Sequence, residues 1–380
     1  MYFGWLYIYI FCVIIYVDVQ RGVIVKLLLL TERLKEIHWG PTTMNMMQRV
    51  AEFKGKQQLF FQQSPEILTA MKNVAMIQST ESSNRIEKII VTSKRLTEIV
   101  NERAEPMDRS ESEIAGYRDV LKIIHESYEH MPITTNVILQ MHSYLLRYAT
   151  GNGGKYKISD NDITEELPTG ETIIRFKPVS AFGTKDAMQD LVNGFRKRKE
   201  EGIYPELLLI AIFILDFLSI HPFSDGNGRM ARLITLLLLY QAGYEVGRYV
   251  SLEKCVEDTK DQYYTTLQKS SVGWHEEMND VRPWVEYFLT MLIEAQERFE
   301  QRMGDLDRGR GWKSRQVEAV IQQLMGHFSV SDLVDRCPGI TGPTIRQVLA
   351  RMSKKGSIVA VSMGRNARWR KVDIEEEDLE

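Results

Sequence analysis

One segment, HPFSDGNGRMAR at residues 221–232, constrains the structure of this chain more than any other. It joins two apolar runs, LLLIAIFILDFLSI at 207–220 and LITLLLLY at 233–240, through a glycine-rich turn. The first run has only fourteen residues and contains Asp216, whereas a membrane-spanning helix needs ~20 apolar residues. The sequence therefore predicts two helices buried in a globular core and joined by a short polar turn.

This turn has the features of an anion site. A helix that begins near Gly228 has unpaired backbone N–H groups and a positive dipole end at its N-terminus. Gly226 and Gly228 let the preceding backbone bring its N–H groups close to a phosphate, which side chains would obstruct. Arg229 and Arg232 are three residues apart, so they share a helix face and can bind one polyphosphate. We interpret the turn as a triphosphate site.

Two further side chains of the segment have the chemistry for transfer of a phosphorus group. Asp225 supplies a hard oxygen ligand of the kind that Mg²⁺ accepts together with phosphate oxygens. His221 can act near neutral pH as the base that takes a proton from an attacking hydroxyl. Each feature alone has an ordinary structural explanation, since such turns, helix-end histidines and arginine pairs are common. The ordered combination is specific.

The string H-P-F-S-D-G-N-G-R-M-A-R matches H-x-F-x-[DE]-G-N-G-R-x-x-R, the signature of the Fic family, which this chain therefore resembles. The segments MHSYLL, GGKYKISDNDI and RFKPVSAF also resemble the family's sequence around its flap. The resemblance covers roughly residues 64–300.

The resemblance implies AMP transfer from ATP to a protein hydroxyl, with release of pyrophosphate. His221 would deprotonate the target Ser, Thr or Tyr, and Asp225 would hold Mg²⁺. Asn227, with the N–H groups around Gly226 and Gly228, would bind the α- and β-phosphates. The β- and γ-phosphates would lie on Arg229 and Arg232. Family members that act as kinases have lysine at the second glycine, so the glycine here favours AMP transfer, while the base of the donor nucleotide is not encoded in the motif.

Residues 151–180 interrupt the helical pattern with glycines and two β-branched stretches, KYKISDNDI and ETIIRF. They predict a hairpin-like flap inserted among helices. By resemblance, Ile173, Ile174, Arg175 and Phe176 would hold a target segment by strand addition, which depends on main-chain hydrogen bonds and needs little sequence information. The identity of the target protein is therefore not readable from the sequence.

Upstream, Ser83 and Glu87 are four residues apart and share a helix face. A solvated helix surface is the ordinary explanation of such a pair. The pair also resembles the family's inhibitory motif, [ST]-x-x-x-E-[GN], in which the glutamate pairs with the second motif arginine, here Arg232. Lys88 stands where that motif has Gly or Asn, which leaves the end of the helix open. In some relatives the same glutamate orients a water that removes AMP, so the reverse reaction is an alternative.

The C-terminal residues 312–372 contain eleven Lys and Arg against three acids. Three helical segments followed by two strand-like pieces resemble a winged helix-turn-helix, whose third helix would place Thr344, Arg346 and Gln347 near base edges of DNA. A protein-binding module, or one that packs on the Fic core, is the alternative. A DNA-binding regulator whose Fic fold binds nucleotide is accordingly the second function class.

The N-terminal residues 1–45 fit no standard pattern. Tyr2–Val17 is uncharged but short for a membrane span, and it lacks the basic start and cleavage site of a signal peptide. Either translation begins downstream, at Met44, Met46 or Met47, or the segment is a short anchor. With an anchor, Arg21 and Lys26 would favour a cytoplasmic main body. We expect no stable membrane association.

Composition and local signals complete the predicted organisation. Hydrophobic residues are 44%, charged residues 26% and the net charge is -3, as in an ordinary soluble protein. Three separated cysteines suggest neither disulfides nor zinc and favour a reducing cytoplasm. Ser110 with Glu113 is a candidate capping box, and Thr134 or Thr135 a candidate helix cap. A homodimer is possible, as in many Fic relatives.

The predicted fold is mainly α: a Fic-type helical bundle with a small β-hairpin flap, followed by a winged helix-turn-helix. The predicted parts are an N-terminal extension (1–45), a Fic domain with its preceding inhibitory helix (46–303), a linker (304–311), a winged helix-turn-helix-like domain (312–372) and an acidic tail (373–380).

Overall fold

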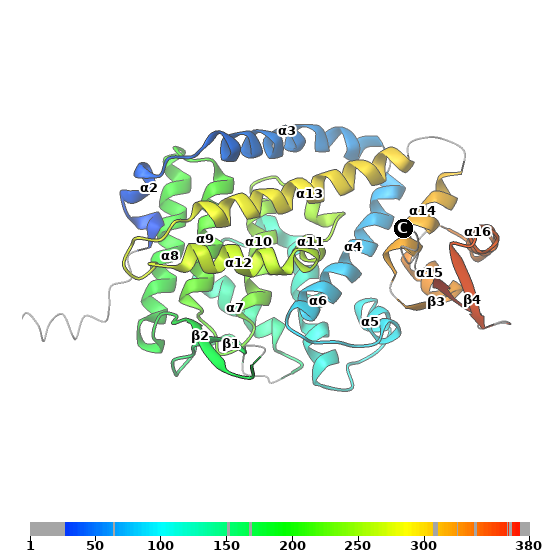
Figure 1. Cartoon of the computed structure of the whole chain (residues 1–380), viewed down its shortest axis with the longest axis horizontal. Coiled ribbons are helices and arrows are strands. Elements are labelled where there is room, and N and C mark those ends of the chain that lie inside the picture. The colour runs from blue at the N-terminus through cyan, green and yellow to red at the C-terminus, as the bar shows by residue number, and fades with distance from the viewer. Residues whose placement is uncertain are drawn as a thin grey trace, which may run out of the picture. The chain divides into compact units, whose positions relative to one another are not determined.

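The computed structural model describes residues 27–372 except 64, 150–152, 167–168, 307–310, 325, 338–339, 363 and 365–366. Most of the N-terminal extension, part of the predicted linker and the acidic tail lie outside the described residues. Within them the chain is mainly helical with two small antiparallel sheets, which confirms the prediction of a mainly α fold (Figure 1). No described helix is long and apolar enough to cross a membrane.

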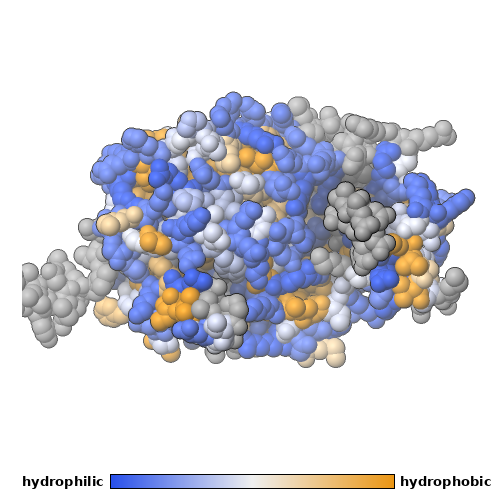
Figure 2. Space-filling view, in the orientation of Figure 1, coloured by the Kyte–Doolittle hydropathy of each residue, from blue (hydrophilic) through white to orange (hydrophobic). Residues whose placement is uncertain are grey.

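The described chain divides into two compact units. The first contains the described residues up to Gln48 together with Ala115–Gly243 and Asp258–Thr290, and the second contains Arg49–Ile114, Tyr244–Glu257 and the described residues from Met291 onward. On the face seen in Figure 2, most of the surface is hydrophilic and the hydrophobic residues form small separate groups.

The elements of the first unit are η1 (Leu28–Leu30), α2 (Arg33–Glu36), η2 (Tyr128–His130), α7 (Thr135–Leu145), β1 (Ile163–Glu166), β2 (Thr172–Phe176), α8 (Ala181–Glu201), α9 (Glu206–Ile220), α10 (Asn227–Gln241) and α12 (Lys260–Ser271). Four helices have residues in both units: α3 (Pro41–Gln63), α6 (Arg109–Ser127), α11 (Leu252–Asp258) and α13 (Arg282–Leu306).

The core of the first unit is built on α9 and α10, which lie side by side with α8 against α9 (Figure 1). Every residue of α9 from Leu207 to Ile220 is buried, so the apolar run is a core helix, as predicted. Trp284 donates its indole N–H to the backbone oxygen of Ala211 at 2.8 Å. The core therefore fixes the C-terminal end of α9 and the start of α10, where the motif segment lies.

The flap is a two-stranded antiparallel hairpin in which β1 pairs with β2, with a bulge after Ile163. The first strand begins at Ile163, so the predicted strand over 155–163 was placed too early. Part of that earlier stretch is instead hydrogen-bonded to the backbone of the motif loop. The backbone N–H of Lys157 donates to Pro222 at 2.9 Å, and the amide of Asn161 donates to the backbone oxygen of Phe223 at 3.1 Å.

The elements of the second unit are α4 (Pro65–Ile86), α5 (Ser93–Val100), η3 (Val246–Arg248), α14 (Trp312–Gln323), β3 (His327–Ser329), α15 (Val330–Arg336), α16 (Gly342–Lys354), β4 (Ile358–Ser362) and β5 (Arg368–Lys371). The three strands form a sheet in the order β3-β5-β4. Sequence patterns predicted the last three helices and β4 and β5, but not β3.

The C-terminal helices and α4 share one hydrophobic core. Val317 and Ile321 of α14, Leu333 of α15 and Ile345 of α16 are buried in it, together with Val74 of α4. A buried arginine adds a polar link, since Arg336 of α15 donates to the hydroxyl of Thr97 on α5 at 3.0 Å. Residues 312–358 therefore pack directly on the segment that contains the candidate inhibitory motif.

Candidate active site

His221 lies at the C-terminal cap of α9, where its backbone turns left-handed with φ 51° and ψ 61°. Its N–H donates to the backbone oxygen of Phe217 at 2.9 Å, which closes the helix. A non-glycine residue in this conformation is strained by roughly 1–2 kcal/mol. Such strain often persists at functional sites because the surrounding structure fixes it. The turn directs the chain into the motif loop and leaves the histidine half-exposed.

The loop returns into α10 at Gly226, the N-cap, which has φ 82°. A Cβ atom at Gly226 would lie 3.2 Å from the side chain of Leu145. Any residue other than glycine would also be strained by the left-handed backbone conformation at this position. Because the N-cap is glycine, it supplies no side-chain cap to the N–H groups in the first turn of α10. A helix N-terminus of this kind can bind an anion, and the anion site expected from the glycines stays a prediction.

Asn227 holds the loop closed from within. Its side-chain oxygen accepts the N–H of Phe223 at 2.9 Å, and its amide donates to the backbone oxygen of Phe223 at 2.7 Å. The residue is 3% exposed. Its amide is thus used to brace the loop, and its contribution to an anion would come from its backbone N–H.

His142 of α7 contacts the backbone of the motif loop and helps to hold it in place. This residue was not identified from the sequence. Its Nδ1 accepts the N–H of Gly154 at 3.1 Å, so Nε2 carries the proton and donates to the backbone oxygen of Asp225 at 3.1 Å. The ring stacks on Phe223 with centroids 3.7 Å apart. Burial lowers the pKa of His142 to about 4, so the ring is neutral at physiological pH. Its position in MHSYLL, ahead of the glycine-rich stretch, was the available signal.

The two motif arginines are buried rather than solvated. Arg229 is 1% exposed and Arg232 is 6% exposed. A guanidinium nitrogen of Arg229 lies 3.4 Å from a carboxylate oxygen of Asp225, whose side chain is 51% exposed and also accepts the N–H of Gly226 at 2.6 Å. Both guanidinium groups belong to the first turns of α10, beside its N-terminus. They can hold a polyphosphate.

Asp225 is the candidate metal ligand. Within the described part of the chain, no three His, Cys, Asp or Glu side chains lie close enough to hold a metal ion by themselves. Mg²⁺ commonly binds through one or two carboxylates plus substrate phosphate oxygens. One exposed carboxylate beside the N-terminus of α10 fits that mode, with the phosphates completing the coordination.

The flap residues of β2 differ in exposure. Ile173 and Phe176 are half-buried, whereas Ile174 and Arg175 are exposed. Phe176 stacks on His275 with centroids 5.4 Å apart, and a ring nitrogen of His275 lies 2.7 Å from the backbone oxygen of Lys177. The body of the first unit thus anchors the end of β2.

The candidate inhibitory pair lies in the second unit, at the end of α4. Ser83 is fully buried within the helix, and Glu87 follows its last residue, Ile86. Lys88 has φ 63°, the left-handed conformation that ends a helix and favours Gly or Asn. Its N–H donates to the oxygen of Arg85 at 2.9 Å. The helix therefore ends at the place where the motif requires, although lysine is the less suitable residue.

Residues 132–239 match the model of the Fic/DOC family. This part of the chain is therefore similar to a Fic domain. The matched residues include α7, α8, α9 and the loop from His221 to Gly226.

Two curated proteins illustrate the likeness in sequence. Protein adenylyltransferase fic-1 of Caenorhabditis elegans is 30% identical over 183 residues, which are 47% of this chain and 32% of that protein. Protein adenylyltransferase Fic of Nematostella vectensis is 25% identical over 221 residues, which are 56% of this chain and 46% of that protein. The chain thus spans less than half the length of these relatives.

Two solved structures share the fold. A Fic family protein from Desulfovibrio desulfuricans G20 superposes with a TM-score of 0.57 at 20% identity, covering 90% of this chain and 99% of that one. Fic-1 residues 134–508 from C. elegans superpose with a TM-score of 0.55 at 20% identity, covering 69% of this chain and 73% of that one.

Proposed function

We propose that the protein is an adenylyltransferase that transfers AMP from ATP to a Ser, Thr or Tyr hydroxyl of a protein. The observation that carries the proposal is one loop that unites a histidine, a helix N-terminus whose N-cap is glycine and two buried arginines. These groups lie in the residues that match the Fic/DOC family. The activity named for the C. elegans and N. vectensis relatives supports the same reaction.

In this mechanism His221 accepts the proton of the target hydroxyl as the oxygen attacks the α-phosphorus of ATP. The bond between the α-phosphorus and the oxygen that bridges to the β-phosphate breaks, and pyrophosphate leaves. The N–H groups at the start of α10 bind the α- and β-phosphates. Arg229 and Arg232 bind the β- and γ-phosphates and stabilise the negative charge of the leaving pyrophosphate.

Asp225 would hold Mg²⁺ together with phosphate oxygens, and the ion would neutralise charge on the triphosphate. The side chains of His142 and Asn227 act on the reaction only by holding the loop. Because both bind its backbone, they keep His221 and the first turn of α10 in fixed relation to each other. Positioning of this kind accounts for much of the catalysis of phosphoryl-type transfer.

The flap would bind the target protein. An extended target segment would add to the hairpin by main-chain hydrogen bonds, with Ile174 and Arg175 exposed to contact its side chains. Such binding requires a protein substrate with an accessible extended segment but sets few demands on its sequence.

Glu87 would inhibit the reaction by pairing with Arg232 and excluding the productive position of the γ-phosphate. The end of α4 supports this role, since Lys88 takes the left-handed conformation that the inhibitory motif assigns to Gly or Asn. Substitution Glu87→Gly should then raise AMP transfer. The same glutamate could orient water for removal of AMP from a modified target, which is the alternative direction of the reaction.

The second candidate function is DNA binding by residues 312–372 as a winged helix-turn-helix. Three helices with a sheet of order β3-β5-β4 support it, as do exposed Arg346 and Gln347 on α16. Exposed Arg368 and Arg370 on β5 would add phosphate contacts. Binding to duplex DNA that weakens steeply with salt would support this function, and binding that is independent of salt would exclude it.

Cys255 and Cys337 are free thiols, which suits the reducing cytoplasm proposed as the location.

The test of AMP transfer uses ATP labelled at the α-phosphate, with γ-labelled ATP in a parallel reaction. Wild type, Glu87→Gly and His221→Ala are each incubated with Mg²⁺ and a cell lysate. Label from the α position only, absent with His221→Ala, is expected. Label from the γ position would identify a kinase, and no label with any variant would favour the nucleotide-binding regulator.

A further inference from the structure

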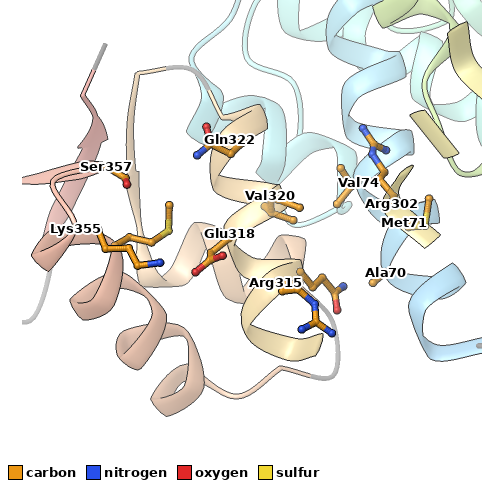
Figure 3. Close-up of a pocket in the computed structure, with 13 residues that line it drawn as sticks. Ala70, Met71, Val74, Arg302, Arg315, Glu318, Val320, Gln322, Lys355 and Ser357 are labelled. Atoms are coloured by element: carbon orange, nitrogen blue, oxygen red, sulfur yellow. The ribbon is translucent and has the colours of Figure 1, made fainter. Parts of the chain in front are cut away.

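A cavity of about 440 Å³ lies in the second unit where α4, α14, α16 and the end of α13 meet (Figure 3). Its volume lies within the range of about 300–1,000 Å³ that is usual for sites of small organic ligands. The cavity shares no residue with the motif loop, whose residues all belong to the first unit. The reaction proposed above makes no use of it.

The walls of the cavity are largely apolar. Met71 and Val74 of α4 are on one side, and Val320 of α14 is opposite them in Figure 3. Met352 of α16 also lines it. Methionine side chains adapt to irregular shapes and suit a flexible alkyl chain. Among the described residues that line the cavity, none is aromatic, so it offers no ring on which a nucleobase would stack.

The polar part of the lining carries a positive charge. Arg302, Arg315 and Lys355 contribute three cations, and Figure 3 shows Arg315 between the other two. Glu318 is the one acid among the described lining residues, and it pairs with Arg351 at 2.7 Å. Burial beside Arg298 lowers the pKa of Arg302 to about 10, so an anion nearby would stabilise its charged form.

We propose that this cavity binds an amphipathic monoanion, a medium-chain alkyl carboxylate, with its chain along Met71, Val74 and Val320 and its carboxylate on Arg315. Arginine presents a planar pair of donors that matches a carboxylate. A neutral alcohol would lack the ion pair, and an amine would be repelled by the three cations. The positive charge of the lining therefore selects an anion, and the apolar walls select an alkyl chain.

Filling the cavity also affects inhibition by Glu87, a consequence that rests on the proposed function. Val74 lies on α4 about 18 Å, at 1.5 Å per residue, before the last residue of the helix, Ile86, which Glu87 follows directly. A ligand that fills the cavity adds contacts between α4 and α14 and stabilises the arrangement in which both are packed. It therefore strengthens inhibition by Glu87 and lowers the rate of AMP transfer.

Binding is tested on the full chain without ATP, by titrating octanoate into protein labelled with ¹³C at the methionine methyl groups. Saturable shifts of the Met71 and Met352 signals are expected, with far weaker binding of octan-1-ol and octylamine. Arg315→Ala and Lys355→Ala should each weaken the Kd for octanoate about tenfold. Their matched controls, Lys313→Ala and Lys354→Ala, remove exposed cations that do not line the cavity and should leave the Kd unchanged.

A second kind of variant tests the cavity without removing any charged side chain. Ala319→Trp places a large side chain at an exposed position of the lining, so it should block octanoate while the protein still unfolds cooperatively. No saturable binding to wild type, equal binding of octan-1-ol, or an equal loss with Lys313→Ala would overturn the site.

The effect on the reaction is measured separately, with saturating octanoate. A several-fold lower rate of AMP transfer is expected in wild type and no change in Glu87→Gly. An unchanged rate in wild type with octanoate bound would overturn the effector role. If no variant transfers AMP, the proposed function fails, and the titration still decides whether the site exists.

Discussion

His142 on α7 donates its Nε2 proton to the backbone oxygen of Asp225, at 3.1 Å, and so ties the motif loop to a helix about eighty residues earlier in the chain. The same ring accepts the N–H of Gly154 and stacks on Phe223. One neutral imidazole thus joins α7, the glycine-rich stretch and the loop. The geometry of the candidate active site depends on a residue outside its motif.

Replacing this ring tests its role. His142→Phe keeps the stacking but leaves two partly buried backbone groups without this partner, so we expect a loss of about 1 kcal/mol in the free energy of unfolding. The rate of AMP transfer should fall more than the affinity for ATP. His130→Phe, at an exposed position, should change the stability by less than about 0.5 kcal/mol. Urea unfolding measures both, and equal effects of the two substitutions would contradict the assignment.

The neutral state of His142 also predicts a pH dependence. Its folded pKa of about 4 lies below the ordinary histidine value of 6.5, so the unfolded chain binds the proton more tightly. Its contribution to stability is therefore present above pH 6.5 and is lost as the pH falls toward 4. Unfolding measured across this range should show a shallower decline in His142→Phe than in wild type.

Asp216 on α9 should act in the opposite direction. Burial raises its pKa to about 7, while its carboxylate accepts the indole N–H of Trp274 at 2.8 Å. The folded state holds the proton more tightly, so stability declines as the pH rises from about 4 to 7. Asp216→Asn keeps an acceptor for Trp274 and should be more stable than wild type at pH 8. Asp261→Asn, on the surface of α12, is the control, and an equal gain there would refute the explanation.

The strained backbone of His221 at the end of α9 predicts different stabilities for two substitutions of this residue. Asparagine tolerates the left-handed conformation that His221 adopts, whereas alanine does not. His221→Asn should therefore be more stable than His221→Ala by about 1 kcal/mol, and both should lack AMP transfer. Equal thermal midpoints of the two variants would show that the backbone at this position relaxes.

Lys88 allows a related test at the end of α4. Its φ of 63° is relaxed in glycine but strained in lysine or alanine. Lys88→Gly should raise the free energy of unfolding by about 1 kcal/mol, and Lys88→Ala should leave it nearly unchanged. If Glu87 inhibits as proposed, the more rigid helix end in Lys88→Gly should also reduce AMP transfer. A rise in rate would count against that mechanism.

The sequence predicted those features that depend on local patterns. The apolar run at 207–220 is a buried helix, the glycines at 226 and 228 lie at the start of the next one, and Thr134 caps α7 through the N–H of Val137. The predicted capping box at Ser110 was wrong, because α6 begins at Arg109 and Asp108 accepts the N–H of Glu111 instead. Several polar residues compete at that end, and propensity alone does not rank them.

Features that depend on tertiary pairing could not be predicted. The strand β3 has three residues and exists because β5 pairs with it. The role of Asn227 inside the loop follows from the position of Phe223, four residues earlier, once the turn has closed. His142 lies far from the motif in sequence, and only the packing of α7 brings it to Asp225.

The central claim is that His221 acts as the base in AMP transfer. Intact-protein mass spectrometry of Glu87→Gly after incubation with ATP and Mg²⁺ tests it directly, alongside the double variant Glu87→Gly/His221→Ala. We expect addition of one or more adenylyl groups to hydroxyl side chains in the single variant and none in the double variant, with ATP binding equal in both. Equal adenylylation of the two variants would contradict the account.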